Sequence, residues 1–112
     1  MHGEDYEIGA EAAQAINQAQ RVLAVGTTSM RVLESLPPGS ISASRGRTDI
    51  FIRPGFHFQH TQALLTNFHL PKSTLFVLVC AFAGTDLMRR AYAEAIAEKY
   101  RFFSYGDCIL IL

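Results

Sequence analysis

The chain has 112 residues, of which 49% are apolar, and its 10 Lys and Arg residues balance its 10 Asp and Glu residues. This length suits one domain with one core, and this apolar content excludes a disordered chain. A neutral chain has no broad positive field for gathering nucleic acid, so any RNA contact needs a local patch or basic surface outside this chain.

The cysteines and the apolar runs indicate a cytoplasmic domain. Cys80 and Cys108 both lie in apolar runs, which predicts buried free thiols rather than a disulfide framework, and neither has metal-ligand spacing. The polar, acidic start is unlike a signal peptide. The longest apolar run, residues 75–83, is too short to span a bilayer. We therefore expect a soluble cytoplasmic protein that binds no metal and no membrane.

The N-terminal part of the chain predicts a strand, a helix and a second strand. Residues 2–8 alternate with period two, and His2 and Glu4 share one face, either as a base with its carboxylate or as a solvated pair. Residues 11–20 are rich in alanine at helical spacing. Residues 21–25 end in four apolar side chains, which is typical of a buried strand in a parallel sheet.

A glycine and three hydroxyl residues follow this strand and open a helix expected over residues 30–36. Glycine lets the backbone approach a ligand closely, and a helix start favours a carboxylate or phosphate. Ligands of open α/β sheets bind beyond the carboxyl ends of the strands. The residues of this candidate anion site are Gly26, Thr27, Thr28, Ser29 and Arg31. The alternative is plain capping of the helix by a hydroxyl.

The middle of the chain predicts a loop and two strands. Residues 37–47 are rich in Ser, Gly and Arg after two prolines, which indicates a surface loop. We expect strands over residues 48–52 and 63–68, with a Pro-Gly turn and a half-buried edge at residues 56–60 between them.

Residues 66–74 form the strongest candidate site, because they gather polar side chains between two apolar runs. Pro71 favours an extended residue before it and a helix start after it, which predicts a strand-to-helix corner where anions are favoured. The polar side chains are Asn67, His69, Lys72 and Ser73. They indicate either a functional site, or a turn at Asn67, a packed histidine and a helix cap at Ser73.

Two helices and a strand are expected to complete the chain. Residues 73–83 are apolar all round, which predicts a buried helix that ends at Gly84. A second helix is expected over residues 85–100, capped by Thr85, with Leu87, Ala91, Ala95 and Ile96 facing inward. Residues 108–112 predict a last buried strand.

Tyr105 and Asp107 flank a glycine just before the last strand and are candidates to face a pocket. Taken together, the elements predict an α/β fold with a mixed, partly parallel sheet and flanking helices. Residues 1–112 would then form a single α/β domain or the C-terminal portion of one, as an incomplete part of a larger α/β domain.

Several strings occur together in one order along the chain. They are Gly26-Thr27-Thr28-Ser29, residues 48–52 with Pro54-Gly55, residues 66–75 and residues 100–107. In these strings the chain resembles the S-adenosylmethionine:tRNA ribosyltransferase-isomerase family of queuosine biosynthesis. The likeness covers nearly the whole chain, which is similar to the C-terminal third of the much longer family proteins.

The resemblance implies transfer and isomerisation of the ribosyl moiety of S-adenosylmethionine to 7-aminomethyl-7-deazaguanine at the wobble position of tRNA, giving epoxyqueuosine. S-adenosylmethionine is consumed, adenine and methionine leave, and no metal is needed. A base must remove the proton beside the cationic sulfur, and His69 has a suitable pKa. By residue chemistry, we assign catalysis to His69, Asn67 and Lys72. We assign substrate binding to Gly26, Thr27, Thr28, Ser29, Arg31, Ser73, Tyr105 and Asp107.

Two hypotheses remain open from the sequence. The chain is part of a tRNA-modifying transferase, with S-adenosylmethionine and tRNA as partners, or it is a non-catalytic folding or interaction unit. The strings favour the first hypothesis for the whole enzyme, whereas the neutral charge and the missing segments favour the second for this chain alone. We expect the chain alone to be inactive, and to self-associate because a truncated sheet leaves an unpaired edge.

Overall fold

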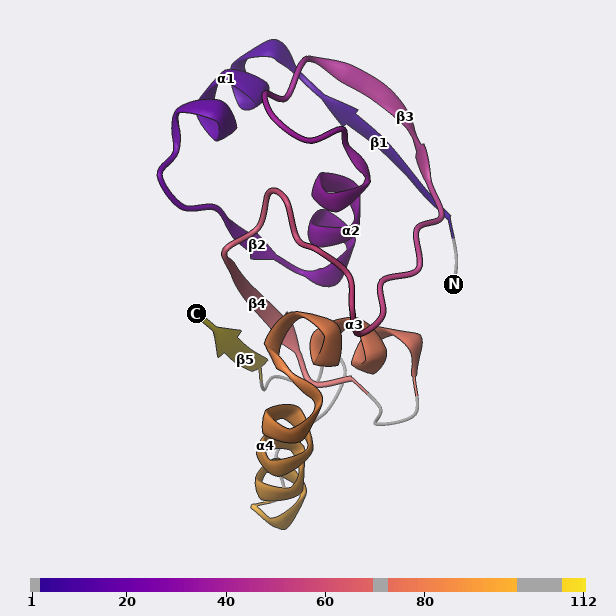
Figure 1. Cartoon of the computed structure of the whole chain (residues 1–112), viewed down its shortest axis with the longest axis vertical. Helices are drawn as coiled ribbons and strands as arrows, with labels where there is room; N and C mark the ends of the chain where they lie inside the picture. The colour runs from indigo at the N-terminus through magenta and orange to yellow at the C-terminus, as the bar shows by residue number, and fades with distance from the viewer. Residues whose placement is uncertain (1–2, 70–72, 99–107) are drawn as a thin grey trace.

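The computed structural model describes residues 3–69, 73–98 and 108–112 (Figure 1). The elements follow the order β1 (Glu4–Ile8), α1 (Ala10–Gln18), β2 (Leu23–Val25), α2 (Thr27–Ser35), β3 (Ser44–Thr48), β4 (Ala63–Asn67), α3 (Thr74–Ala83), α4 (Thr85–Ala97) and β5 (Cys108–Ile111). Strands and helices are thus mixed along the chain, which confirms the predicted α/β class.

The larger sheet has the strand order β2-β4-β5. β2 runs parallel to β4, whereas β5 runs antiparallel to β4. The predicted mixed, partly parallel sheet is therefore confirmed. This topology brings the carboxyl ends of β2 and β4 and the amino end of β5 to one edge, where the candidate site lies.

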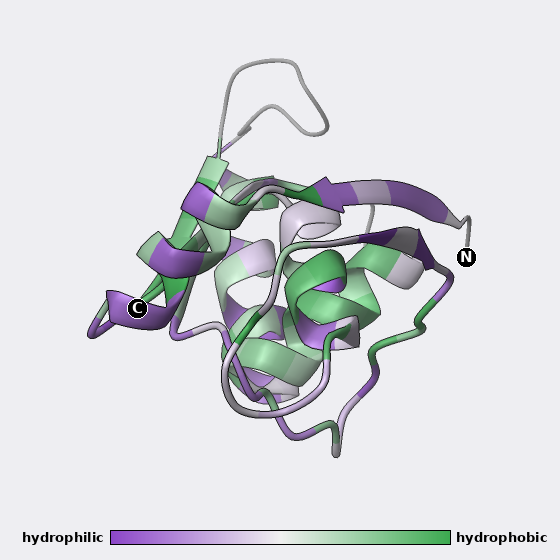
Figure 2. Ribbon diagram, turned by 90° about the horizontal axis from the view of Figure 1, so that it is seen from above, coloured by the Kyte–Doolittle hydropathy of each residue, from purple (hydrophilic) through white to green (hydrophobic). Residues whose placement is uncertain are grey.

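The smaller sheet is a two-stranded ribbon of β1 and β3. β3 occupies residues 44–48, so the expected loop 37–47 is too long, and the strand expected at 48–52 is wrong. The loop composition misleads because β3 pairs with β1 through the backbone ladder, while its own sequence carries exposed charged side chains and no apolar run. Arg45 lies 3.0 Å from Glu7, and Arg47 lies 3.0 Å from Asp5. Figure 2 shows the hydrophilic colouring of these strands near the N-terminus.

The main core packs α2, α3 and α4 against one face of the larger sheet (Figures 1 and 2). Leu64 of β4 and Leu78 and Val79 of α3 are fully buried. On α4 the buried residues are Met88, Tyr92 and Ala95, at the spacing of one helical face.

The predicted inward face of α4 is partly wrong. Leu87 and Ile96 are 48% and 57% exposed, because the buried face is centred on Tyr92. The helix also ends at Ala97, and Gly84 rather than Thr85 is its N-cap. Gly84 does end α3, as predicted, with a φ of 101°.

The last strand and one cysteine are also less buried than expected. Cys80 is buried in α3, but Cys108 is exposed at the start of β5. Along β5, exposed and half-buried residues alternate, because successive side chains face the main core and the opposite side of the sheet, which the described chain leaves uncovered. The prediction of a buried thiol at Cys108 and of a fully buried last strand is therefore wrong.

Candidate active site at the sheet edge

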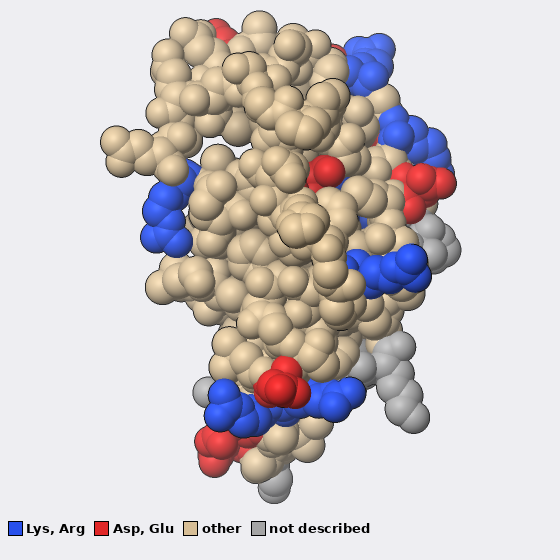
Figure 3. All heavy atoms as spheres, viewed as in Figure 1, with Lys and Arg blue, Asp and Glu red and all other residues tan. Residues whose placement is uncertain are grey.

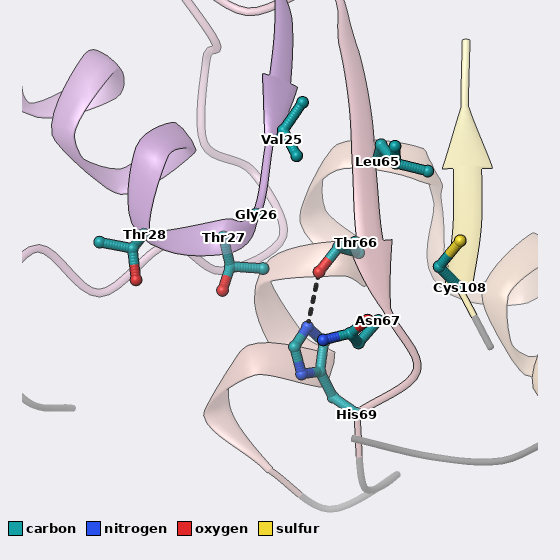
Figure 4. Close-up of a pocket in the computed structure, with 9 residues that line it drawn as sticks. All are labelled: Val25, Gly26, Thr27, Thr28, Leu65, Thr66, Asn67, His69 and Cys108. Carbon is teal, nitrogen blue, oxygen red and sulfur yellow. Dashed lines mark hydrogen bonds between the residues drawn. The ribbon is translucent and has the colours of Figure 1, made fainter. Parts of the chain in front are cut away.

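A cavity of about 390 Å³ opens where β2 and β4 end (Figure 4). Its lining comprises Val25, Gly26, Thr27, Thr28, Leu65, Thr66, Asn67, His69 and Cys108. These residues come from β2, from the first turn of α2, from β4 and the segment after it, and from the start of β5. The cavity therefore lies where ligands bind in open α/β sheets, beyond the carboxyl ends of parallel strands.

Gly26 forms the sharp corner between β2 and α2. Its φ of 93° is a conformation that favours glycine, and its N–H donates to the Leu65 carbonyl at 2.8 Å. A Cβ atom built at Gly26 meets no atom within 4 Å, so the space beside this backbone is open. The corner thus gives a ligand close access to the start of α2.

The hydroxyls at the start of α2 point to one side of the corner. Figure 4 shows the side-chain oxygens of Thr27 and Thr28 directed to the side on which His69 lies. The helix begins at Thr27, earlier than expected, and none of these hydroxyls caps it. Plain capping, the alternative explanation of the hydroxyl run, therefore does not apply to α2. Thr27 is only 7% exposed, which makes its position well defined.

His69 follows β4 and is held by two hydrogen bonds. Its Nε2 lies 3.0 Å from Thr66 Oγ1, and its backbone N–H donates to the Tyr92 hydroxyl at 3.0 Å. The residue is 8% exposed, and burial lowers its pKa below the usual 6.5. At neutral pH the imidazole is therefore uncharged and able to accept a proton.

Asn67 is the last residue of β4 and lies opposite Cys108 in the sheet register. Both residues are exposed and line the cavity. The structure thus brings together five of the predicted site residues, although their roles stay predictions. They are Gly26, Thr27, Thr28, Asn67 and His69.

Three other predicted site residues lie outside this lining. Ser29 is exposed on α2, and Ser73 caps α3 by accepting from the Phe76 N–H at 3.1 Å. Arg31 is 2% exposed rather than solvated; its Nε donates to the Ile50 carbonyl at 3.2 Å. Its Nη1 also lies 3.6 Å from Glu4 Oε1, so within the described chain Arg31 ties α2 to β1. Lys72, Tyr105 and Asp107 lie outside the described residues.

The sequence analysis assigned no role to Thr66, Tyr92 or Glu34. Thr66 lies three residues before His69, and this spacing within one polar stretch was the available signal. Tyr92 gave no local signal, because its hydroxyl reaches His69 from α4. Glu34 is buried, and its carboxylate accepts the N–H groups of residues 59–61 at 2.6, 3.0 and 2.8 Å. This buried carboxylate fixes the segment that leads into β4.

Among residues 3–69, 73–98 and 108–112, no group of three or more His, Cys, Asp or Glu side chains is placed to hold a metal ion. In the same part of the chain, the helices lack the length and apolar character needed to cross a membrane.

Comparisons with known proteins agree with this fold. A family model described as queuosine biosynthesis protein matches residues 1–111. The S-adenosylmethionine:tRNA ribosyltransferase-isomerase of Syntrophus aciditrophicus is 56% identical over 114 residues, which cover 100% of this chain and 32% of that protein. The protein of the same name from Gluconacetobacter diazotrophicus is 58% identical over 117 residues, which cover 99% of this chain and 33% of that protein.

A solved structure is similar as well. The crystal structure of S-adenosylmethionine tRNA ribosyltransferase from Thermotoga maritima matches with a TM-score of 0.84 at 44% identity, and the match covers 96% of this chain and 40% of that chain. The chain spans about a third of the length of the curated relatives that it matches. These matches confirm the resemblance seen in the sequence strings: the chain belongs to the queuosine biosynthesis protein family.

Proposed function

We propose that this chain supplies part of the active site of an S-adenosylmethionine:tRNA ribosyltransferase-isomerase. In this proposal the whole enzyme works in the cytoplasm and transfers the ribosyl moiety of S-adenosylmethionine to 7-aminomethyl-7-deazaguanine in tRNA, giving epoxyqueuosine. The observation that carries the proposal is the cavity at the sheet edge. It places a buried, neutral histidine beside a glycine-hydroxyl helix start, in a chain 56% identical to a relative of that name.

His69 is proposed as the base. The carbon beside a cationic sulfur is acidified, and a base must take its proton before the ribose ring opens and adenine leaves. Since burial lowers the pKa of His69, the imidazole is already unprotonated at neutral pH. A base acts on the transition state, so its loss should lower turnover far more than it weakens substrate binding.

The start of α2 is proposed to bind an anionic group, either the methionyl carboxylate of the cosubstrate or a phosphate of the tRNA. The open space beside Gly26 admits the group, and the first N–H groups of α2 and the hydroxyls of Thr27 and Thr28 would contact it. Asn67, across the cavity, would then donate to the departing adenine.

Basic surface for the tRNA is sparse on the face of the described chain seen in Figure 3. Figure 3 shows Lys and Arg side chains in small separate groups, some of them beside Asp or Glu. The ribbon arginines are both paired with carboxylates. We therefore expect the rest of the enzyme to supply most of the phosphate contacts.

The second candidate function is a non-catalytic folding or interaction unit. One observation favours it for the chain alone: Val25, Leu110 and Leu112 are 64%, 53% and 82% exposed on the larger sheet. Such an apolar surface is typical of a segment that packs against another.

The test is adenine release from S-adenosylmethionine in the presence of tRNA that carries the aminomethyl base. We expect no turnover by this chain alone, and turnover by a chimera in which it replaces the matching segment of the Syntrophus aciditrophicus relative. In the chimera, His69→Ala should lower turnover by about a hundredfold to ten-thousandfold, with a smaller effect on cosubstrate affinity.

His57→Ala is the matched control, since His57 is exposed and absent from the cavity lining. Turnover by the isolated chain at the chimera's rate would disprove the proposal that it is only part of the site. Unchanged turnover in the His69→Ala chimera would reassign His69 to packing.

A further inference from the structure

The Thr66 hydroxyl contacts one of the two ring nitrogens of His69. Thr66 is 5% exposed in β4, and its Oγ1 lies 3.0 Å from His69 Nε2 (Figure 4). For Nδ1, no hydrogen bond is found within the described residues. The two nitrogens of a neutral imidazole differ in role, and the partner of one nitrogen determines which of them carries the proton.

We propose that Thr66 is a positioning residue that accepts a hydrogen bond from His69 Nε2–H, so that Nδ1 carries the lone pair and is the nitrogen that takes a proton from the substrate. This proposal rests on the proposed function of His69 as the base. In the step, the substrate C–H bond breaks and its electron pair stays on the carbon beside the sulfur. The proton forms the Nδ1–H bond of an imidazolium.

Thr66 serves both states of the imidazole in this arrangement. Before the step, its oxygen holds the proton on Nε2, and after the step the same hydrogen bond faces a charged donor and becomes stronger. The opposite arrangement, in which the Thr66 hydroxyl donates to Nε2, would occupy the lone pair and leave a proton on Nδ1. That tautomer cannot act as a base from Nδ1, so the direction of this one hydrogen bond decides whether His69 is competent.

Tyr92 fixes the backbone at the same point. Its hydroxyl accepts from the His69 N–H at 3.0 Å, and its ring packs edge-on against Phe68 and Phe76 at centroid distances of 5.3 and 4.6 Å. Packing in the core therefore fixes the Tyr92 hydroxyl, and this hydroxyl fixes the backbone from which the His69 side chain extends. Cys108 of β5 is the other titratable group of the described chain that lines this cavity with His69.

The first test reads the tautomer directly in the chain. The ¹⁵N chemical shifts of the His69 ring are measured at a pH well above the usual histidine pKa of 6.5. We expect Nε2 to be protonated and Nδ1 unprotonated. Thr66→Val, which keeps the shape and removes the hydroxyl, should shift the population towards Nδ1–H, and Thr66→Ser should restore the parent pattern. A parent chain protonated on Nδ1, or a pattern unchanged by Thr66→Val, would overturn the proposal.

The second test uses the chimera described above. We expect Thr66→Val to lower turnover by about tenfold, the scale of one lost hydrogen bond, with little change in KM, and Thr66→Ser to keep most of the activity. Full turnover in Thr66→Val would disprove the positioning role while leaving the proposed function intact. Absence of turnover in the parent chimera would count against the proposed function, and the tautomer measurement would still decide the role of Thr66.

Discussion

The two faces of the β2-β4-β5 sheet differ sharply in burial. On the face that packs against α3 and α4, Ala24 and Leu64 are 2% and 0% exposed. On the opposite face, the register places Val25 beside Leu65 and Leu65 beside Leu110, and Val25 and Leu110 are 64% and 53% exposed. Both faces are apolar in sequence, which is typical of a sheet with parallel strands that is covered on both sides. The described chain supplies the layer for one face.

The largest expected effect is a difference in the free energy of unfolding between two Leu→Ala variants, one on each face of the sheet. Leu64→Ala opens a cavity in the packed face and should lower the free energy of unfolding by about 2–5 kcal/mol. Leu110→Ala removes the same atoms from an exposed site and should cost less than about 1 kcal/mol. Urea denaturation of both variants measures the difference. Equal losses would mean that the open face of the sheet is covered in solution.

Two glycines that cap helices differ in backbone conformation, and one of them lies at the sheet edge. Gly26 caps α2 with a φ of 93°, whereas Gly9 caps α1 with a φ of −74°. Neither position would bring a Cβ atom within 4 Å of another residue, so only the backbone conformation distinguishes them. Gly26→Ala should destabilise by about 1–2 kcal/mol, and Gly9→Ala by much less.

Thermal unfolding of the two glycine variants gives the answer. Similar melting temperatures would show that the corner at Gly26 relaxes at no cost. A selective loss for Gly26→Ala would confirm that the strand-to-helix corner beside the cavity depends on glycine.

The open face should also make the chain associate. We expect sedimentation to show a concentration-dependent increase in mass, because exposed Val25, Leu110 and Leu112 can be buried between copies. Leu110→Lys should weaken association by about tenfold, the scale of one apolar side chain lost from an interface. Ile96→Lys, at an exposed apolar residue of α4, is the control. A clean monomer over a wide concentration range would contradict this prediction.

The sequence predicted local features of the fold better than distant pairings. Apolar runs, together with nearby residues that begin or end an element, predict β4, α3 and the glycine that ends α3. β3 was missed because its Ser-Arg-Gly-Arg-Thr sequence has no apolar run and forms a strand by pairing with β1, which lies far away in sequence. The exposure of β2 and β5 was likewise unpredictable, because an apolar strand has the same sequence whether or not a second layer covers it.

The candidate site divides in the same way. Gly26 and His69 were predicted as candidates because the conformational freedom of glycine and the pKa of histidine are properties of the single residue and need no distant partner. The contact from Tyr92 to His69 depends on how α4 packs, and no local pattern encodes it. Arg31 was assigned to the site from its distance to Gly26 along the helix, but the helix rotation directs it to Ile50.

Stability should depend on pH through His69, which is buried just after the end of β4. Burial lowers the pKa of His69 in the folded chain below the usual 6.5, so the unfolded chain binds a proton first as the pH falls. The contribution of neutral His69 to the free energy of unfolding is therefore complete above pH 6.5. It decreases as the pH falls from 6.5 towards the lowered pKa of the folded chain. His69→Gln should flatten this part of the profile in urea denaturation between pH 8 and pH 5, the range in which an ordinary histidine changes its charge. An unchanged slope would place the dependence on other groups.

The smallest expected effect lies in the exposed charge pairs of the β1-β3 ribbon. Arg45 and Glu7 meet at 3.0 Å, but their side chains are 78% and 66% exposed. A double-mutant cycle with Arg45→Ala and Glu7→Ala should give a coupling of about 0.2–1 kcal/mol, because water screens the pair and ordering two long side chains costs entropy. Arg53→Ala, at an exposed arginine of the turn after β3, controls for the loss of one positive charge.

Added salt should reduce the coupling in the ribbon while leaving association through the apolar face of the larger sheet intact, since screening acts on charges alone. A coupling above about 2 kcal/mol, or one insensitive to salt, would show that the ribbon charges are shielded from water in solution.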